Sequence, residues 1–253
     1  MSVLAVIPAR LGATRLPRKP LRLLGGEPLV VRVYQRVVSL GLVDHVVVAT
    51  DHPEVLAACE TRGIPVVLTR DDHPSGTDRV AEVAARPEYA NFSVILNVQG
   101  DEPFVSRDAL RGAVEIVSGG VAPIGTASVP IPVSALVQPD VVKVVRGDDG
   151  LALYFSRAPI PFLRDPAEAE LHRDLARQHV GVYAYTRAAL QAWVRFAPHP
   201  LELVERLEQL RPMAHGLAIG VAEVPAAEGG IDTEADLERA NSRWNTMHTN
   251  TLS

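Results

Sequence analysis

The stretch VLAVIPARLGATRLPRKPL, residues 3–21, passes directly from a short apolar run into a strongly basic loop. The apolar run, residues 3–7, is rich in β-branched side chains, as expected for a buried strand. Similar runs follow as HVVVAT from His45, IPVVLT from Ile64 and SVILNVQG from Ser93. Continuous apolar runs of this length are typical of parallel strands that are covered on both faces. The first hundred residues therefore predict a mostly parallel sheet.

The segments between these runs have helical patterns, at residues 29–40, 54–62 and 78–85. Alternation of strand and helix predicts the α/β class, with right-handed crossovers and a Rossmann-like layered sheet. Ligands of such sheets bind beyond the carboxyl ends of the strands. The basic loop after residue 7 and the NVQGDEP loop, residues 97–103, both follow predicted strands. We expect a binding site there.

The pattern becomes less regular after about residue 120. GTASVPIPV, DVVKVV, HVGVYAYT and AIGVAEV are predicted strands, and residues 187–196 and 201–211 are predicted helices. Prolines at 159, 161 and 166 argue against a helix in that segment. A last helix is predicted from Thr233, with Asp232 or Thr233 as its N-cap. This half predicts a smaller, mixed portion of the fold.

Composition excludes several classes of protein. The chain has 253 residues and a net charge of −5, which argues against general nucleic-acid binding. Its only cysteine, Cys59, excludes an intrachain disulfide and a thiolate metal cluster. The first apolar run is too short for a signal peptide, and no window reaches the roughly 20 apolar residues of a membrane span. We expect a cytoplasmic protein.

The basic loop offers Arg10, Arg15 and Lys19 beside Gly12, but contains neither of two common phosphate-binding motifs, G-x-x-x-x-G-K-[ST] and G-x-G-x-x-G. Guanidinium and ammonium groups are suited to phosphate oxygens, so three cations here favour a triphosphate ligand. The alternative is a solvated basic loop without function. The position of the loop after a buried strand favours the binding site.

Two further segments add candidate ligand-binding groups. Ser75, Gly76 and Thr77 form a small polar turn that could approach a ring closely, although Thr77 or Asp78 could instead cap the next helix. Asp101 follows the fourth predicted strand, where a carboxylate facing phosphates would suit Mg²⁺. A turn or capping aspartate is the alternative.

Taken together, the motifs resemble one family over nearly the whole chain, from about residue 3 to about residue 240. They are IPAR, TRLP with KPL, HPSGTDR, NVQGDEP, VVKVV, LYFSRAPIP, HVGVYAY, LEQLR and GIDTEADLE. This combination is similar to the 3-deoxy-manno-octulosonate cytidylyltransferases, also called CMP-Kdo synthetases. Asp140 and the IPFLRD segment depart from the usual pattern. These departures leave open whether the sugar is Kdo or an 8-amino analogue.

The resemblance implies that the anomeric hydroxyl of Kdo, an acidic eight-carbon sugar, attacks the α-phosphate of CTP. CMP-Kdo, a precursor for lipopolysaccharide biosynthesis, and pyrophosphate are formed with Mg²⁺ as cofactor. It further implies a homodimer and a single nucleotidyltransferase domain over residues 1–253. Residues 1–120 would be mainly nucleotide-binding, and residues 121–253 would bind the sugar and form the dimer contact. No general base stands out, so we expect metal coordination to lower the pKa of the sugar hydroxyl.

The resemblance also assigns roles to individual residues. The implied nucleotide-binding residues are Pro8, Ala9, Arg10, Arg15, Lys19, Ser75, Gly76, Thr77 and Arg79. The implied sugar-binding residues are Gln99, His179, Tyr183, Glu208 and Gln209. Asp101 and Asp232 would hold the metal, and Arg10, Lys19 and Asp101 would be catalytic.

Some of these roles have structural alternatives. Asp232 could be only a helix cap, and His179 beside an apolar run could be a structural histidine. Tyr183 lies four residues after His179, so both would face the same side of a strand. Glu208 and Gln209 would point about 100° apart on the predicted helix. Arg157 could bind the sugar carboxylate, but a role in holding loops or the dimer contact is favoured.

Three other functions compete with this interpretation. A cytidylyltransferase for another acidic sugar, such as a sialic acid, is the nearest, and NVQGDEP with H-x-G-x-Y argues against it. An NAD-dependent oxidoreductase is disfavoured by the missing G-x-G-x-x-G motif. A catalytically dead nucleotide-binding protein would have no need to retain both the basic loop and the two aspartates.

Overall fold

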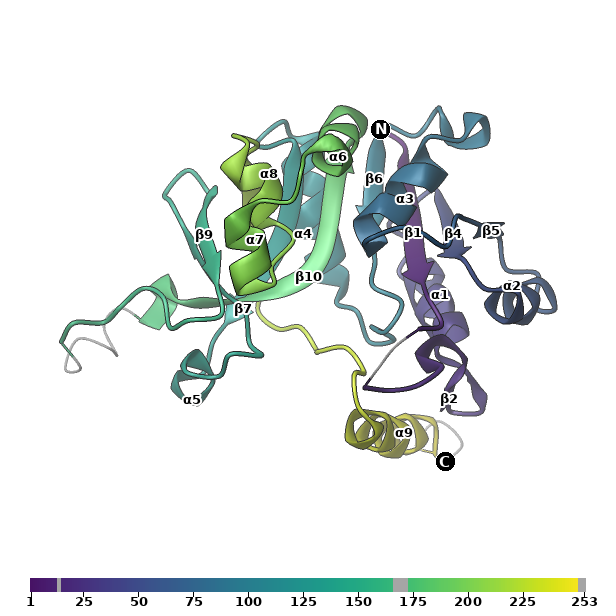
Figure 1. The fold of residues 1–253 in the computed structure, drawn as a ribbon. Coiled ribbons are helices and arrows are strands. Elements are labelled where there is room, and N and C mark those ends of the chain that lie inside the picture. Colours follow the sequence, from purple (N-terminus) through teal and green to yellow (C-terminus); the bar gives the residue numbers. More distant parts are fainter. Residues whose placement is uncertain (13–14, 166–172, 250–253) are drawn as a thin grey trace. The chain divides into compact units, whose positions relative to one another are not determined.

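The computed structural model describes residues 1–12, 15–165 and 173–249 (Figure 1). Their contacts divide the chain into two compact units. The first, here called the β1 unit, consists of the described residues within 2–92, 97–105 and 228–249. The second, the β10 unit, consists of residue 1 and the described residues within 93–96 and 106–227. The C-terminal segment thus packs with the N-terminal strands, whereas residues 106–118 pack with the later ones.

Parallel strands form the centre of the β1 unit. β1 (Val3–Ala9) pairs with β4 (His45–Thr50), which pairs with β5 (Val66–Leu68). Val6 lies opposite Val47, and both side chains are fully buried. The strands predicted from residues 3, 45 and 64 are therefore confirmed, as is the α/β class with a mostly parallel sheet.

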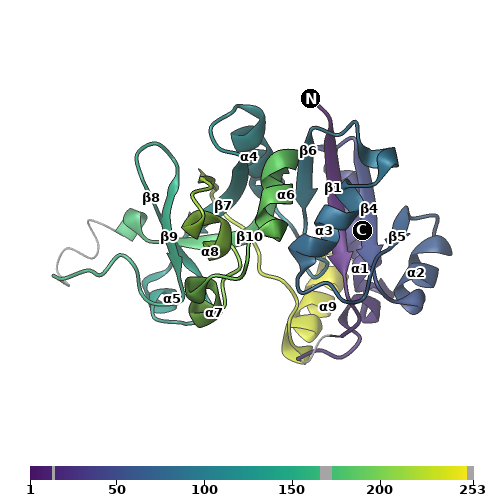
Figure 2. The same cartoon turned by 45° about the horizontal axis from the view of Figure 1, so that its top comes forward.

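Helices α1 (Leu29–Ser39) and α3 (Gly76–Ala84) cover opposite faces of β1 and β4 (Figures 1 and 2). This coverage on both faces explains why the strands are continuous apolar runs. The remaining elements of the β1 unit are α2 (Pro53–Glu60), α9 (Glu234–Thr249), the short strands β2 (Leu23–Leu24) and β3 (Glu27–Pro28), and the 3-10 turns η1 (Lys19–Leu21) and η2 (Pro87–Tyr89).

The C-terminal helix α9 is joined to the N-terminal part of the β1 unit by apolar packing. Leu237 and Ala240 of α9 form one buried cluster with Leu16, Leu24 and Leu29. The helix begins at Glu234, and Thr233 caps it as predicted: its Oγ1 accepts a hydrogen bond from Asp236 N at 3.2 Å. The Asp236 carboxylate in turn accepts from Thr233 N at 2.8 Å, which completes a reciprocal cap.

The β10 unit is built on a mixed set of strands. β7 (Ile124–Pro130) pairs antiparallel with β10 (Arg177–Thr186) and parallel with β11 (Ile219–Glu223). β8 (Lys143–Arg146) pairs antiparallel with both β10 and β9 (Ala152–Ser156). β6 is Val94–Asn97. The mixed character predicted for this half is confirmed, although β9 was not predicted as a strand.

Helix α4 (Arg107–Ser118) covers one face of β7, β10 and β11, and the sequence analysis did not predict it. Its cap, Ser106, accepts from Ala109 N at 3.5 Å. On the other face lie α6 (Arg187–Arg195), α7 (Pro200–Glu205) and α8 (Leu210–Ala214) (Figures 1 and 2). The short elements α5 (Val133–Leu136) and η4 (Arg173–Leu175) complete the unit.

Two local predictions are wrong. Residues 201–211 do not form one helix, because Arg206 has a left-handed backbone (φ 54°) that ends α7. The cap of α3 is Ser75 rather than Thr77 or Asp78: Ser75 Oγ accepts from Asp78 N at 3.3 Å. The proline-based expectation is confirmed for residues 157–165, which contain no helix, while Pro166 lies outside the described residues. Within the described ranges, no helix has both the length and the apolar composition needed to cross a membrane.

Close packing of α4 on β7 generates a stability prediction. A Cβ on Gly125 would lie 2.2 Å from the backbone oxygen of Ala113 in α4. Because backbone must move to admit that atom, Gly125→Ala is expected to lower the free energy of unfolding by about 1–3 kcal/mol. The control is Gly229→Ala, where a Cβ meets nothing within 4 Å. Urea unfolding of both variants measures the effect, and equal stabilities would contradict the packing argument.

Candidate active site

An ionic cluster of the β1 unit lies near the carboxyl end of β1. The ammonium of Lys19 lies 2.6 Å from Asp101 Oδ2 and 2.8 Å from Asp232 Oδ1. Arg15 joins the cluster through a 3.0 Å contact with Asp232 Oδ2. The structure therefore brings together four of the predicted site residues, from three distant parts of the sequence. Arg10, the third predicted phosphate-binding cation, is exposed and, among the described residues, forms no ion pair with this cluster.

Close backbone contacts place the two carboxylates. A Cβ on Gly100 would lie 2.6 Å from Pro8 O, so only glycine lets the Asp101 loop run this close to the end of β1. Ile231 N donates to Asp101 O at 2.9 Å, which fixes the C-terminal segment beside the same loop. Asp232 follows directly. The predicted approach of Asp232 to Asp101, which sequence alone could not demonstrate, is thus built by main-chain contacts.

The paired carboxylates fit the Mg²⁺ ion that the family resemblance implies. Both accept hydrogen bonds from one ammonium, which here stands in for a metal cation. In the described part of the chain no group of three or more His, Cys, Asp or Glu side chains could hold a metal. Mg²⁺ does not need such a group, since it is commonly bound by one or two carboxylates together with phosphate oxygens and water. The assignment of Asp101 and Asp232 as metal ligands stays a prediction.

The electrostatics of the cluster favour bound cations. Burial lowers the pKa of Lys19, but the Asp101 and Asp232 carboxylates outweigh this effect, so its pKa is raised from the ordinary value. Glu102 was missed in the sequence analysis, although it adjoins Asp101 in the NVQGDEP motif. Burial, and then the charges of Asp101 and Asp232, raise the pKa of Glu102 to about 8. Negative charge is therefore dense at this point of the β1 unit.

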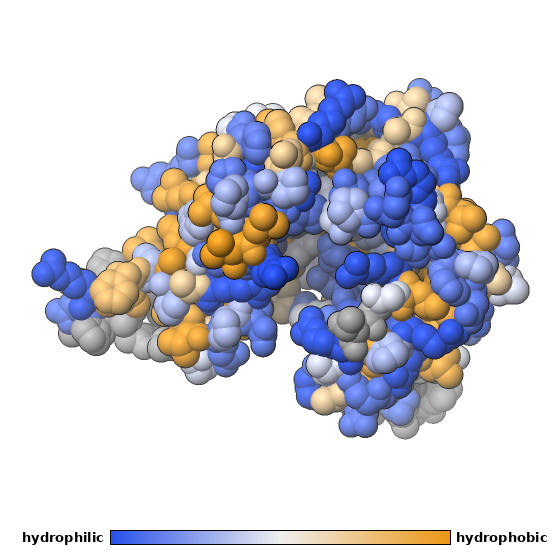
Figure 3. Space-filling model, viewed as in Figure 1, coloured by the Kyte–Doolittle hydropathy of each residue, from blue (hydrophilic) through white to orange (hydrophobic). Residues whose placement is uncertain are grey.

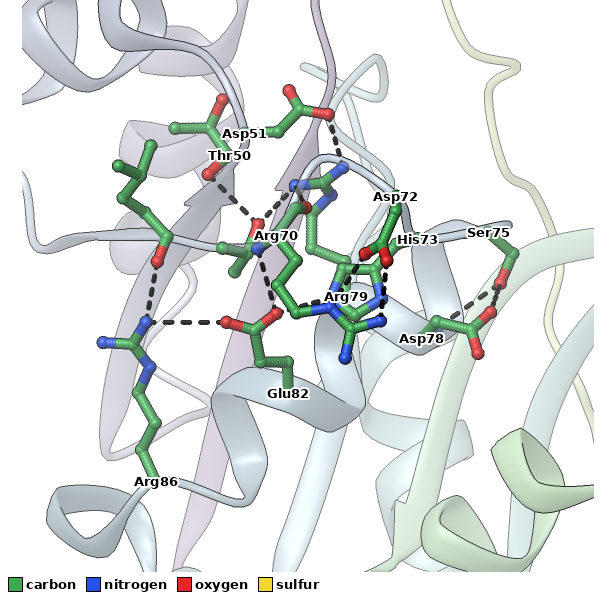
Figure 4. Close-up of polar contacts among 12 residues, drawn as sticks. Thr50, Asp51, Arg70, Asp72, His73, Ser75, Asp78, Arg79, Glu82 and Arg86 are labelled. Carbon is green, nitrogen blue, oxygen red and sulfur yellow. Dashed lines mark hydrogen bonds and ion pairs between the residues drawn. The ribbon is translucent and has the colours of Figure 1, made fainter.

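The polar turn at residues 75–77 lies beside the end of β1. A Cβ on Gly76 would lie 3.5 Å from Pro8 Cγ, so the start of α3 packs against the first residues of the predicted nucleotide site. Thr77 and Ala9 are buried. Ser75 Oγ donates to Asp78 Oδ2 at 2.6 Å (Figure 4). Ser75 therefore caps α3, and its role in nucleotide binding stays a prediction.

The Arg79 side chain is buried among protein groups and does not face an open site. Its guanidinium is buried and donates to Asp51 Oδ2 at 2.6 Å, to Arg70 O at 3.3 Å and to the Thr69 hydroxyl (Figure 4). His73 Nε2 lies 2.5 Å from Glu82 Oε2 in the same network. These contacts fix the loop that leads to Ser75. The predicted contact of Arg79 with a nucleotide stays untested, but its contacts here fix the neighbouring backbone.

The predicted sugar-binding residues of the β10 unit form a second group. The rings of His179 and Tyr183 lie 5.4 Å apart, which confirms that both face one side of β10. Glu208 is close enough to Tyr183 to act on its pKa, which burial first and then Tyr185 and Glu208 raise well above its ordinary value. Among the described residues the buried Tyr183 hydroxyl has no hydrogen-bond partner. An unsatisfied polar group of this kind is suited to a ligand.

The turn between α7 and α8 carries the other two predicted residues. Glu208 and Gln209 lie in this turn, and Gln209 is buried. The prediction that both belong to one helix is wrong, because the left-handed backbone of Arg206 ends α7 before it reaches them. Gln99 belongs to the β1 unit, and its carbonyl accepts from Glu102 N at 3.2 Å. The sugar contacts of all three stay predictions.

Two cations of the β10 unit, the buried Lys143 and the partly exposed Arg157, hold its loops. The fully buried Lys143 ammonium donates to the carbonyls of Gln138 at 2.9 Å, Val141 at 2.6 Å and Arg157. Burial lowers the pKa of Lys143. Arg157 donates to Glu205 O at 2.8 Å and to a further loop carbonyl. The favoured loop-holding role of Arg157 is confirmed, and that of Lys143 was not foreseen.

A layered α/β sheet with a basic loop and two convergent carboxylates at a strand end defines a nucleotide-binding transferase fold. Residues 4–219 match the family model described as cytidylyltransferase. The chain is 74% identical over 248 residues, 98% of its length and 96% of the relative's, to the 3-deoxy-manno-octulosonate cytidylyltransferase of Gemmatimonas aurantiaca. A relative of the same name from Polynucleobacter necessarius is 46% identical, with 93% of each chain covered. The chain belongs to the cytidylyltransferase family.

Solved structures agree with this assignment. A CMP:2-keto-3-deoxy-manno-octonic acid synthetase in complex with CTP superimposes with a TM-score of 0.89 and 37% identity, covering 98% of this chain and all of the other. A 4-diphosphocytidyl-2C-methyl-D-erythritol synthase from Anaerococcus prevotii has a TM-score of 0.60 at 14% identity, with 96% and 98% covered. The second likeness concerns the fold alone.

The environment of His179 predicts a pH dependence. Burial lowers the pKa of His179 to about 3. Below pH 6.5 the unfolded chain takes up a proton on this histidine while the folded chain does not, so the stabilisation is present above that pH and is lost as the pH falls. Between pH 7 and 5 the free energy of unfolding should fall by about 2 kcal/mol from this residue.

The control for this pH effect is His179→Gln, which removes the titrating group but keeps a polar side chain. Its loss of stability between pH 7 and 5, measured by urea unfolding, is expected to be smaller by that amount. Parallel pH profiles of the two proteins would contradict the assignment of a low pKa to His179.

Proposed function

We propose that this chain transfers the cytidylyl group of CTP to Kdo, forming CMP-Kdo and pyrophosphate. The observation that carries the proposal is the convergence of Lys19, Asp101 and Asp232 at the carboxyl end of β1. A relative 74% identical over nearly the whole chain bears the name of this activity. In this reaction the anomeric oxygen bonds to the α-phosphorus, the bond to the β-phosphate breaks, and the hydroxyl proton is released.

Positive charge from the basic loop would hold the triphosphate. Arg10 and Arg15 are exposed and can turn their guanidinium forks toward phosphate oxygens. Lys19 lies at the base of the loop, where its charge would stabilise the negative charge that develops on the leaving pyrophosphate. Phosphoryl transfer depends mainly on such positioning and charge stabilisation, so the protein needs no covalent intermediate. Arg10 and Lys19 are the residues to which we assign this role.

The cytidine would lie against the turn that begins α3. Pro8 and Ala9 end β1 there, and Ser75, Gly76 and Thr77 form the opposing backbone. The absence of a Cβ at Gly76 keeps that surface flat. Because Arg79 fixes the loop that leads into this turn, we assign it a supporting role in nucleotide binding.

Asp101 and Asp232 would hold Mg²⁺. When bound, the ion would neutralise phosphate oxygens and would lower the pKa of a coordinated hydroxyl. The protein keeps the two carboxylates side by side through the close approach of Gly100 to Pro8 and the hydrogen bond from Ile231 N to Asp101 O.

The sugar would be recognised by Gln99 and by the β10-unit residues His179, Tyr183, Glu208 and Gln209. The Tyr183 hydroxyl has no hydrogen-bond partner among the described residues, and the Glu208 carboxylate acts electrostatically on it; hydroxyl and carboxylate groups suit a polyhydroxylated ligand. Relatives named for Kdo do not favour another acidic sugar. We place the reaction in lipopolysaccharide biosynthesis. The need for CTP and the free, buried thiol of Cys59 support a cytoplasmic location.

A homodimer is also part of the proposal. Large apolar side chains of the β10 unit are exposed, among them Phe162 (84%), Val204 (83%) and Val137 (71%). Figure 3 shows apolar surface gathered over α7, which contributes Leu201, Leu203 and Val204. Clusters of this kind mark contact surfaces. A second copy of the chain is the occupant that the family resemblance favours.

The first test of function is pyrophosphate release from CTP, Kdo and Mg²⁺. Asp101→Asn and Asp232→Asn are each expected to lower kcat/KM by at least about a hundredfold, since each removes a charge that would bind the metal. The matched control is Asp108→Asn, which alters a surface carboxylate paired with Arg111.

UTP in place of CTP and a sialic acid in place of Kdo complete the assay. Release with CTP and a different sugar only would keep the cytidylyl half of the proposal and overturn the sugar. If no tested sugar gives pyrophosphate release, or if both aspartate variants keep full activity, the proposed site would be overturned.

The second test is the oligomeric state. Sedimentation should give the mass of a dimer for the wild-type chain, and Val204→Glu should shift it toward the monomer, because the charge would be buried in the contact. The control Val38→Glu changes an exposed valine of α1 in the β1 unit. A monomeric wild-type protein would contradict the dimer.

A further inference from the structure

The hydroxyl of Thr126, on β7, has three hydrogen-bonding neighbours and only one hydrogen. Its Oγ1 lies 2.7 Å from Val182 O, 3.1 Å from Val180 O and 2.9 Å from His179 Nε2. Thr126 is fully buried, so none of these contacts competes with solvent. A carbonyl oxygen can only accept a hydrogen bond. The distribution of the single hydroxyl hydrogen therefore determines what His179 can do.

A β-bulge in β10 creates this arrangement. Val180 pairs with Ala127 and Tyr183 pairs with Thr126, so two residues of β10 have no counterpart on β7. The irregularity turns the carbonyls on either side of Gly181 toward one threonine. A carbonyl offers only lone pairs, so the Thr126 hydroxyl is the donor in both contacts. The hydroxyl hydrogen accordingly lies between Thr126 and these carbonyls, and not on the line to the imidazole.

His179 must then donate to Thr126. With the hydroxyl hydrogen directed at the carbonyls, Oγ1 offers only lone pairs to Nε2, so a hydrogen bond at 2.9 Å requires Nε2 to carry a hydrogen. In the neutral ring the other nitrogen, Nδ1, then holds a lone pair. Among the described residues none has a hydrogen bond to Nδ1. The low pKa of His179, about 3, agrees with a ring that stays neutral at physiological pH.

The groups packed around the ring do not supply another fixed donor. Phe155 meets it edge-on at 5.0 Å and Tyr183 lies at 5.4 Å, and both are aromatic contacts. They hold the plane of the ring without consuming its second nitrogen. Nε2 is occupied by the fully buried Thr126 hydroxyl, so Nδ1 is the ring nitrogen left for a ligand.

We propose that Thr126 is a positioning residue that fixes His179 in the tautomer protonated at Nε2, so that Nδ1 accepts a hydrogen bond from a hydroxyl of the sugar. The inference rests on the proposed function in taking the ligand of this face to be a sugar. It goes further in assigning the direction of the hydrogen bond. A neutral acceptor cannot bind a carboxylate, so the acid group of the substrate must be held by other residues.

The decisive measurement is the tautomer of His179 in the protein without substrate. Nitrogen-15 NMR of imidazole distinguishes a protonated nitrogen from a bare one, and His179→Asn identifies the signals. At pH 7 the expected result is a protonated Nε2 and a bare Nδ1. A protonated Nδ1 would overturn the proposal, whether or not the protein is active.

Variants at Thr126 test the consequence for the sugar. Thr126→Val keeps the shape but removes the acceptor, so the fixed tautomer should be lost. The KM for Kdo is expected to rise about tenfold, the value of one hydrogen bond, while the KM for CTP stays unchanged. Thr126→Ser keeps the hydroxyl and should retain both the tautomer and the wild-type KM within about twofold. A folded Thr126→Val protein with an unchanged tautomer or an unchanged KM for Kdo would overturn the proposal.

These readouts separate the inference from the proposed function. If Thr126→Val does not fold because two carbonyls are unsatisfied, the wild-type tautomer and Thr126→Ser still decide. If the wild-type chain does not use Kdo, the proposed function fails, and the tautomer measurement stands independently of it.

Discussion

The interaction on which the active site depends is the gathering of two carboxylates around one cation. Asp101 and Asp232 repel each other, and bringing them together in a partly buried place is unfavourable unless positive charge lies between them. Lys19 supplies that charge at 2.6 and 2.8 Å, and Arg15 adds a second cation. The basic loop therefore contributes to the folded protein itself. Without it, the C-terminal segment would carry a carboxylate into a site that is already negative.

Main-chain contacts make this gathering specific. The Gly100 backbone passes so close to Pro8 that any side chain would collide with it. A Cβ added at Gly230 would lie only 3.2 Å from the Asp101 carboxylate. Apolar packing of Leu237 against the N-terminal cluster then fixes α9 behind the segment. Electrostatics alone would tolerate many positions of Asp232, whereas these contacts permit one. The site is a product of steric constraint that charge stabilises.

The parts of the fold that could be predicted are those set by residues close together in the sequence. The apolar runs of β1, β4 and β5 and the cap at Thr233 are local patterns, and they identified the strands and the last helix. The break at Arg206 depends on a left-handed backbone that arginine seldom adopts, so no local rule predicted the turn carrying Glu208 and Gln209. Helix α4 was not among the predicted helices, although its buried Ala109, Leu110, Ala113 and Val117 and its Ser106 cap are local signals of a helix. The packing of residues 228–249 with the first strands, and the raised pKa of Glu102, arise from contacts between distant segments that periodicity does not encode.

The two groups of predicted ligand-binding residues use opposite physical means. In the β1 unit the side chains are charged, and their pairing keeps Lys19 protonated. In the β10 unit burial favours the neutral forms of His179 and Tyr183, so hydrogen-bond direction takes the place of charge. A triphosphate is recognised adequately by charge, because its oxygens are equivalent acceptors. A sugar presents several hydroxyl groups that differ mainly in direction, so recognising it requires donors and acceptors of fixed orientation. A histidine with a fixed tautomer meets that requirement, whereas a protonated one would offer donors on both nitrogens and would discriminate less.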